Sequence, residues 1–316
     1  MSLSEYQYVY GPVPSRRLGH SLGIDLVPFK TCTYDCIYCQ LGRTTNKTIE
    51  RKAYVAASII TAEIKKKLAE RPVLDYITLA GSGEPTLNTE IEQVIHNIKT
   101  LTSTPVAVLT NGSLLSEPQV RKALMAADLV IPSLDAGDKS MFQRVNRPQA
   151  DISFEKMVRG IATFRENFVN GLWLEVFLIA KLTDSLEQVK KIAGLANDIQ
   201  PDKVQINTVS RPPAEKYALP VSETNLLLFK ELFRGETEII PEQKNGLSNF
   251  TSLSEIDKNN LLSLLERRPC TALDVSEGLG INITEAVKQL NHLLKEGVIT
   301  TRREGNRLFY ERKRTP

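Results

Sequence analysis

Three cysteines in one short segment are the most chemically informative residues of this sequence. Cys32, Cys36 and Cys39 lie in TCTYDCIYCQ with the spacing CxxxCxxC, and the fourth cysteine, Cys270, is far away along the chain. Thiols clustered this tightly in a reducing compartment indicate ligation of a metal or cluster rather than disulfide bonds. Three thiolates also leave one coordination position without a cysteine.

Two kinds of metal centre are compatible with this spacing. A structural zinc site needs a fourth protein ligand close by, and the nearest candidate is His20, twelve residues before Cys32. An iron–sulfur cluster accepts the same three thiolates and can leave its fourth iron open to an outside ligand. The spacing favours the cluster, and zinc remains the alternative.

The elements that must position these cysteines alternate between strand and helix patterns. We expect strands at 21–28, 75–80, 105–110, 128–134, 172–180 and 203–209, each apolar on both faces, and helices at 56–70, 89–101, 118–126, 154–167 and 186–198. This alternation predicts an α/β fold with a parallel sheet. Six such units fall short of the eight of a closed barrel, so we expect an open, partial (β/α)6 barrel.

Polar motifs follow several of these strands directly. The cysteine segment, GSGEP, Thr110-Asn111 and Ser133 to Asp135 all lie at or just beyond the end of a strand. Ligands of parallel α/β folds bind at the carboxyl ends of the strands, because the loops there converge. The sequence therefore predicts that these motifs meet at one site.

The pattern changes after residue 234. Residues 235–250 are polar and contain Pro and Gly, which predicts a linker between a barrel of residues 1–234 and a second domain of residues 251–316. Helices are expected at 253–266, 272–278 and 282–296, followed by two strands joined at Glu304-Gly305-Asn306. Three helices and a β-wing predict a small winged-helix domain.

Basic residues gather on the expected wing and on the tail: Arg302, Arg303, Arg307, Arg312, Lys313 and Arg314. Such a group suits contact with phosphates of a nucleic acid. The third expected helix is not strongly basic, however, so docking of a protein partner is an equal alternative.

Composition excludes several classes of protein. The chain has 316 residues, 40 basic and 37 acidic side chains and a formal net charge of +3, which argues against a basic coat for nucleic acid. No apolar run approaches the ~20 residues that cross a bilayer. The start MSLSEYQ does not resemble a secretory signal, and four cysteines are too few for a secreted disulfide scaffold. We expect a cytoplasmic protein with no membrane partner.

Two motifs taken together resemble a known family. CxxxCxxC after the first expected strand and GSGEPT after the second are similar to the signature pair of the radical S-adenosylmethionine (SAM) superfamily, and the likeness spans residues 11–211. Within it, YGPVPSRRLG, GSGEPTL, TNGSLL, PSLDA and INTVSRPP resemble the group that includes the wyosine-tRNA synthases and related unassigned proteins. TNG and SLD also resemble the radical SAM enzyme of molybdopterin biosynthesis.

The resemblance implies the cofactors and their chemistry. Cys32, Cys36 and Cys39 would hold a [4Fe-4S] cluster, and SAM would chelate its open iron through its amino and carboxylate groups. A reductase, flavodoxin or ferredoxin would supply the electron that cleaves SAM to methionine and a 5′-deoxyadenosyl radical, which abstracts a substrate hydrogen. No residue is predicted to be catalytic in its own right.

The resemblance also implies residues that bind SAM. They are Tyr38 beside adenine, Ser82, Gly83 and Glu84 at the GGE positions of the family, and Asn111 and Ser133. For each there is a simpler alternative: packing of a loop aromatic, an ordinary βα loop, or an Asn-Gly turn. Outside these motifs, Glu175 is a candidate to face SAM, or else an ion-paired Glu, and Asn207 is a candidate to point into the site or to cap the barrel. Lys181 is a weaker candidate for a substrate contact.

Arginines recur in the loops expected around the mouth of the site: Arg16, Arg17, Arg144, Arg147 and Arg211. Guanidinium groups suit phosphate and carboxylate, which predicts an anionic substrate such as RNA or a nucleotide. The alternative is that these are ion-paired or solvated surface arginines.

Three functions remain open at this point. The first is a radical SAM enzyme that modifies RNA or a nucleotide, although the wyosine reaction is disfavoured because no extra cysteines precede Cys32. The second is a glycyl-radical activase or another radical SAM enzyme with a small-molecule substrate. The third is a DNA-binding regulator that senses through its cluster, which the SAM-site residues disfavour because a sensor needs no SAM-cleaving pocket.

Overall fold

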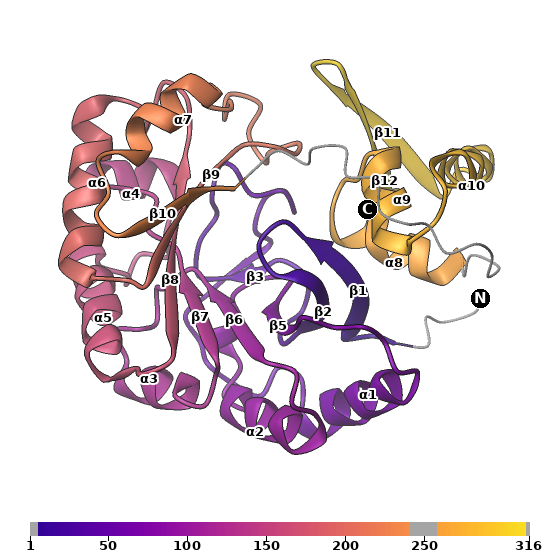
Figure 1. Ribbon diagram of the computed structural model, residues 1–316, viewed down its shortest axis with the longest axis horizontal. Helices are drawn as coiled ribbons and strands as arrows, with labels where there is room; N and C mark the ends of the chain where they lie inside the picture. Colours follow the sequence, from indigo (N-terminus) through magenta and orange to yellow (C-terminus); the bar gives the residue numbers. More distant parts are fainter. Residues whose placement is uncertain (1–5, 241–257, 314–316) are drawn as a thin grey trace.

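An eight-stranded sheet forms the centre of the structure, a computed structural model that describes residues 6–240 and 258–313 (Figure 1). Strand β1 pairs antiparallel with β2, and all further neighbours are parallel. In spatial order the strands are β1 (Val9–Ser15), β2 (Gly19–Asp25), β5 (Tyr76–Ala80), β6 (Val106–Thr110), β7 (Leu129–Pro132), β8 (Gly171–Leu178), β9 (Lys203–Thr208) and β10 (Glu236–Ile239).

Helices cover the outer face of this curved sheet (Figure 1). They are α1 (Ala57–Ala69), α2 (Ile91–Leu101), α3 (Pro118–Leu124), α4 (Lys139–Val145), α5 (Phe154–Asn167), α6 (Leu186–Ile199) and α7 (Glu223–Lys230). The loops carry a short 3-10 helix η1 (Pro85–Leu87) and the strand pair β3 (Thr31–Cys32) and β4 (Asn46–Lys47). Since β1 and β10 form the two edges of the sheet, the barrel is open, as the sequence predicts.

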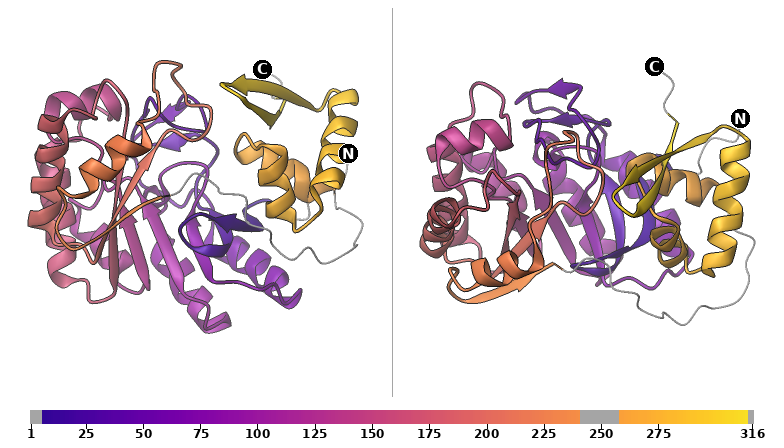
Figure 2. Two further views of the ribbon diagram at one scale, coloured as in Figure 1. Left: turned by 45° about the horizontal axis from the view of Figure 1, so that its top comes forward. Right: turned by 90° about the horizontal axis from the view of Figure 1, so that it is seen from above.

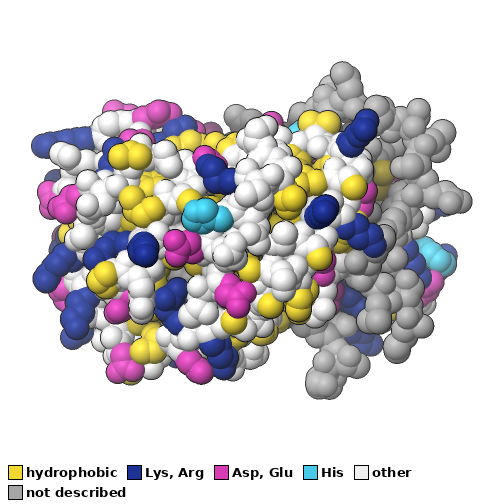
Figure 3. Space-filling model, turned by 90° about the horizontal axis from the view of Figure 1, so that it is seen from below, with side chains coloured by type: hydrophobic (Ala, Val, Ile, Leu, Met, Phe, Trp, Pro, Cys, Tyr) yellow, Lys and Arg dark blue, Asp and Glu magenta, His cyan; other side chains and the backbone are white. Residues whose placement is uncertain are grey.

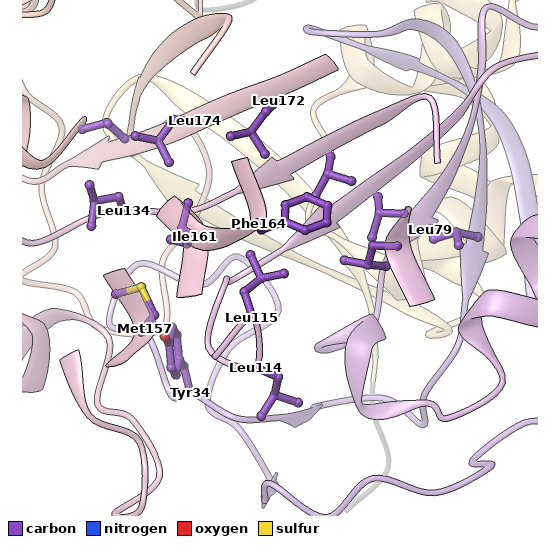
Figure 4. Close-up of a cluster of buried hydrophobic side chains, with 14 of the residues drawn as sticks. Tyr34, Leu79, Leu114, Leu115, Leu134, Met157, Ile161, Phe164, Leu172 and Leu174 are labelled. Carbon is purple, nitrogen blue, oxygen red and sulfur yellow. The ribbon is translucent and has the colours of Figure 1, made fainter. Parts of the chain in front are cut away.

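The two faces of the strands differ in polarity. In β8 every second residue is buried, and Leu172 and Leu174 point toward Ile161 and Phe164 of α5 (Figure 4). The alternate residues of β8 point to the inner side, where Glu175 and Phe177 border a cavity. The expectation that each strand is apolar on both faces therefore fails at Glu175 of β8, whereas β6 and β7 keep the apolar residues Leu109 and Ile131 on the inner side.

Two strands of the eight-stranded sheet lie outside the predicted set, as do the short strands β3 and β4. Strand β1 contains Gly11, Pro12 and Pro14, which argue against a strand but are tolerated at a sheet edge, where no partner needs the missing N–H. Strand β10 pairs with β9 inside the predicted linker, so that interpretation is wrong for residues 236–239. The linker residues 241–250 lie outside the described part of the chain, and helices α4 and α7 were not predicted.

A separate C-terminal unit follows, with α8 (Lys258–Arg267), α9 (Ala272–Leu279), α10 (Ile283–Lys295) and the antiparallel strands β11 (Ile299–Glu304) and β12 (Arg307–Arg312). The three helices and the hairpin appear in the expected order; residues 253–257 of the first expected helix lie outside the described ranges. The unit has its own core, made by Leu261, Leu264, Leu265, Cys270, Val275, Ala286, Leu290, Leu293, Ile299 and Tyr310. Its assignment as a winged-helix domain stays a prediction.

The C-terminal unit lies beside β1, across the sheet from α4, α5 and α6 (Figure 2). Val13 of β1 packs against its core. Two buried ion pairs also cross this boundary: Arg267 of α8 lies 3.1 Å from Asp25 at the end of β2, and Arg211 lies 2.9 Å from Asp274 of α9. The guanidinium of Arg267 is stacked 4.1 Å from the ring centroid of Tyr10.

The outer surface shows no strong bias in charge on the face seen in Figure 3, where basic and acidic side chains are interspersed. This agrees with the formal net charge of +3. Within the described ranges, no helix has both the length and the apolar character needed to cross a bilayer.

We expect Arg267→Met to lower the free energy of unfolding by about 3 kcal/mol, because it leaves the Asp25 carboxylate buried without its partner. Urea unfolding measures the change. Arg144→Met, at an exposed position of α4, is the matched control and should have little effect. The double variant Asp25→Asn with Arg267→Met should recover part of the loss; an additive double variant would contradict the pairing.

Candidate functional site

A cavity of about 400 Å³ lies at the carboxyl ends of the parallel strands. Its walls are the inner-face residues of the sheet, the cysteine loop and α8 of the C-terminal unit. The strand residues include Gly23, Thr78, Leu109, Ile131, Glu175, Phe177 and Asn207, and the loop residues include Lys30, Cys32, Tyr34, Cys36, Tyr38, Cys39, Ser82, Gly83 and Ser133. The motifs predicted to converge therefore do meet around one cavity.

All three clustered cysteines line this cavity, and each sulfur accepts one N–H from a different side chain. The Nζ of Lys30 lies 3.4 Å from Cys39 Sγ, the Nδ2 of Asn111 lies 3.5 Å from Cys32 Sγ, and the Nδ2 of Asn146 lies 3.5 Å from Cys36 Sγ. These donors favour negative charge on the sulfurs.

Burial acts on the thiols in the opposite direction. It raises the pKa of Cys32 to about 12, and it raises the pKa of Cys36 well above its ordinary value. In both cases nearby anionic groups add to the effect, with Glu84 beside Cys32 and Asp135 beside Cys36. Without a cation these thiols stay protonated at neutral pH, so the set suits a positively charged metal centre that deprotonates its ligands.

The zinc alternative loses its fourth ligand. His20 stands at the amino end of β2, away from the strand ends that carry the cysteines; its side chain is 65% exposed and lies 3.4 Å from Asp75. Among residues 6–240 and 258–313, no three His, Cys, Asp or Glu side chains are arranged to hold a single metal ion.

The GSGE segment packs directly against the start of the cysteine loop. A Cβ on Gly83 would lie 1.8 Å from the carbonyl oxygen of Thr31, so a side chain at this position has no room. The Ser82 carbonyl accepts the N–H of Lys30 at 2.6 Å, and the Ser82 N–H donates to Asp25 at 2.7 Å. Gly81 has a φ of +98°, a conformation that favours glycine.

Glu84 and Asn111 lie behind the cavity wall rather than on it. The carboxylate of Glu84 is buried and accepts the N–H of Asn111 and the hydroxyl of Thr110, both at 2.7 Å. Asn111 in turn donates to Thr33 at 2.7 Å as well as to Cys32. These bonds tie together the loops that carry the cysteines. That both residues also contact SAM stays a prediction.

Tyr38, Ser82, Gly83 and Ser133 do line the cavity, as expected for residues that bind SAM. Tyr38 stacks on Phe177 with ring centroids 4.0 Å apart and an interplanar angle of 12°. Its hydroxyl donates to Asp135. Ser133 follows β7 and donates its N–H to the Thr110 carbonyl at 3.1 Å. Their contact with SAM remains a prediction.

Asp135 organises a polar network that the sequence did not reveal. Besides Tyr38, it accepts the N–H of Phe177 at 3.1 Å and the Nδ2 of Asn146 at 2.7 Å. Asn146 therefore links Asp135 to Cys36. Burial raises the pKa of Asp135 to about 6. Asn146 stands at the end of α4, far from either motif, so no local signal indicated it.

Three of the five predicted arginines reach the cavity: Arg16, Arg17 and Arg211. Arg144 is exposed on α4 and does not line the cavity. Arg147 does not line it either and forms an ion pair with Glu215, with 2.8 Å between the charged atoms. The expectation that arginines surround the mouth of the site is therefore wrong for these two residues. Two unpredicted arginines also line the cavity, Arg267 at the end of α8 and Arg268 directly after it. They were missed because the folding of the chain, not sequence spacing, brings α8 to this site.

Of the other predicted site residues, Glu175 and Asn207 line the cavity and Lys181 does not. Glu175 lines the cavity, lies 3.0 Å from Arg17 and accepts the Nδ2 of Asn207 at 3.1 Å. Burial acts to raise the pKa of Glu175, but Arg17 and Asn207 outweigh it and hold that pKa below its ordinary value. Lys181 is exposed and does not line the cavity; its N–H donates to Asp184.

The basic group on the hairpin is partly neutralised. Arg302 lies 2.7 Å from Glu304, and Arg312 lies 2.8 Å from Glu266. Arg303, Arg307 and Lys313 are exposed, and Arg314 lies outside the described residues. Arg302 and Arg312, two of the six predicted basic residues, are therefore ion-paired.

Comparison with known proteins identifies the same family that the motifs resemble. The family model described as the radical SAM superfamily matches residues 26–196. A UPF0026 protein of Methanocaldococcus jannaschii is 32% identical over 309 residues, which cover 95% of this chain and 94% of that protein. A Brachyspira hyodysenteriae protein named GTPase Obg is 39% identical over 91% of this chain, which spans only 42% of that protein.

The fold also matches solved structures. The crystal structure of a radical SAM methyltransferase from Sphaerobacter thermophilus has a TM-score of 0.53 over 69% of this chain and 65% of that chain. The two sequences are 14% identical, so this likeness concerns the fold alone.

The raised pKa of Asp135 predicts a pH dependence of stability. An Asp titrates near a pKa of about 3.9 when unfolded, but near 6 in the folded protein. Its contribution to stability is therefore present below pH ~4 and is lost as the pH rises through ~6. Between these limits, the free energy of unfolding of the apoprotein should fall by about 2–3 kcal/mol relative to Asp135→Asn.

Urea unfolding at pH 4.5 and pH 7 measures this difference. Asp198→Asn, at an exposed position of α6, is the control and should follow the wild type at both pH values. Parallel behaviour of the wild type and Asp135→Asn would show that Asp135 does not titrate in this range.

Proposed function

This chain belongs to the radical SAM superfamily, and from that premise we propose that Cys32, Cys36 and Cys39 hold a [4Fe-4S] cluster beside SAM in the main cavity. Enzymes of this superfamily use both cofactors. The observation that supports the assignment is that three cysteines line one cavity, each with an N–H donor on its sulfur. Hydrogen bonds to sulfur are among the factors that set the potential of such clusters.

When bound, the cluster supplies one electron that cleaves the sulfonium of SAM. The protein's own contribution is to orient and to exclude water. Lys30, Asn111 and Asn146 fix the three sulfurs, and the stacked rings of Tyr38 and Phe177 form an apolar wall. Ser82, Gly83 and Ser133 line the cavity with small side chains, which would leave room for SAM.

The charge of the cavity supports an anionic substrate. Six basic side chains line it, Lys30 and five arginines, against one acidic side chain, Glu175. Asp25 and Asp274 each pair with one of these arginines and still leave the basic groups in excess. A cavity lined by one sign of charge concentrates ligands of the opposite sign. We therefore assign RNA or a nucleotide as the substrate, with the C-terminal unit assisting its recognition as a winged helix.

The remaining assignments follow from the chemistry. A reductase, flavodoxin or ferredoxin delivers the electron. The cytoplasm is the proposed location, because four cysteines without a disulfide are typical of a reducing compartment.

SAM cleavage tests the function directly. Anaerobically reconstituted and reduced protein should release 5′-deoxyadenosine and methionine from SAM, and a cluster-containing regulator should release neither. Addition of an RNA fraction should raise the rate, and this stimulation should fall steeply between 50 and 200 mM salt. Cleavage that responds to an acceptor protein but not to RNA would favour a glycyl-radical activase instead.

Replacement of one cysteine tests the ligand assignment. Cys36→Ala should lose the visible absorption of the cluster and SAM cleavage together, because a cluster needs all three thiolates. Cys270→Ala is the matched control, since Cys270 is buried in the core of the C-terminal unit and should leave both signals intact. SAM cleavage by Cys36→Ala at the wild-type rate would refute the assignment.

A further inference from the structure

A second cavity, of about 250 Å³, lies between the sheet and the C-terminal unit. Its polar lining includes three arginines, Arg16, Arg211 and Arg307, and one acidic residue, Asp274. Arg16 and Arg211 also line the main cavity, so the two cavities share a wall. The function proposed above does not account for this second space.

Arg211 carries an unsatisfied donor at this place. Its side chain is 9% exposed, and its Nη2 lies 2.9 Å from Asp274 Oδ1. Its Nε–H is buried and has no hydrogen-bond partner among the described residues. Buried donors are rarely left unpaired, because they have lost water without gaining another acceptor. Arg211 therefore keeps hydrogen-bonding capacity that its ion pair with Asp274 does not use.

Basic side chains outnumber acidic ones in the lining of this cavity. Asp274 is the one acidic residue of the lining, and its Oδ2 already accepts the N–H of Thr271 at 2.7 Å and the Thr271 hydroxyl at 2.9 Å. Burial, together with repulsion from Arg211 and Arg17, lowers the pKa of Arg16 to about 10. A bound anion would relieve this repulsion.

We propose that this second cavity binds a phosphate group of the substrate, with Arg211 as the central donor and Arg16 and Arg307 assisting. The guanidinium group matches phosphate in geometry and charge. The volume is below the ~300–1,000 Å³ of sites for whole small molecules, which suits one phosphate group. The remainder of the substrate occupies the main cavity across the shared wall, and in this respect the inference rests on the proposed function.

The arginines that line this cavity come from both units of the structure, so a bound phosphate would contact both. Arg16 and Arg211 belong to the sheet domain, and Arg307 belongs to the hairpin of the C-terminal unit. A phosphate held by both units joins them across the cavity. Phosphate binding thus orders the C-terminal unit against the mouth of the main cavity.

Titration calorimetry with inorganic phosphate at low salt, on the reconstituted full chain, tests the site. Wild-type protein should bind phosphate saturably, and acetate should bind more weakly. Arg307→Gln, at an exposed position that cannot unfold the core, should weaken phosphate binding about tenfold, the effect of one charge-assisted hydrogen bond. Arg211→Met should weaken it further. Arg303→Gln, on the same hairpin but outside the cavity lining, is the matched control and should bind as the wild type does.

Wild-type protein that shows no saturable binding of phosphate would overturn the inference. The inference would also be overturned if the Arg307→Gln and Arg211→Met variants bound phosphate as tightly as the wild type does. Acetate that binds the wild type as tightly as phosphate would overturn it as well. SAM cleavage is measured on the same preparations. Its absence, with phosphate binding retained and sensitive to Arg307, would count against the proposed function and still support the phosphate site.

Discussion

The backbone of residues 81–84 lies against the first residues of the cysteine loop, and the geometry of the whole site depends on that contact. Gly83 permits it, because a Cβ there would collide with the carbonyl of Thr31. Two hydrogen bonds hold it, from Lys30 N–H to the Ser82 carbonyl and from Glu84 N–H to the Thr31 carbonyl. The buried Glu84 carboxylate then extends the same support to Thr110 and Asn111. Three strand ends are thus tied to one loop, which fixes the direction of its sulfurs.

This arrangement explains why a buried carboxylate can lie beside thiols that need to become anionic. Burial raises the pKa of Glu84, and its hydrogen bonds to Thr86, Thr110 and Asn111 act against that effect. The side-chain amide of Asn111 donates to Cys32, and the backbone N–H of Asn111 donates to Glu84. Glu84 is thus linked to the sulfur through a neutral residue. Asn146 stands between Asp135 and Cys36 in the same way. In both cases an amide separates like charges and supplies a donor to the sulfur.

Sequence patterns were sufficient for the central elements and for the cysteines, because strand and helix periodicity and the short motifs are local properties. The helix predicted at 154–167 has the same bounds as α5. Strands β1 and β10 were missed because tolerance of Pro and Gly depends on a position at the sheet edge, which only the assembled sheet defines. Asn146 and Arg267 were missed for a related reason: each is an ordinary residue near the end of a helix until the fold brings it to a sulfur or to a buried carboxylate.

Different kinds of contact form the two ends of the main cavity. Residues that hold the cysteines are therefore distinct from the residues that line the opposite end. At the cysteine end, short loops of the sheet are fixed by backbone contacts and buried carboxylates, which leave little freedom for change. At the other end, the wall is made by arginines from two units, and ion pairs such as Arg211 with Asp274 join them. Substitutions at that boundary can alter the shape and charge of the mouth without moving a sulfur. Under the function proposed above, a change of anionic substrate would therefore need substitutions only where the C-terminal unit meets the sheet.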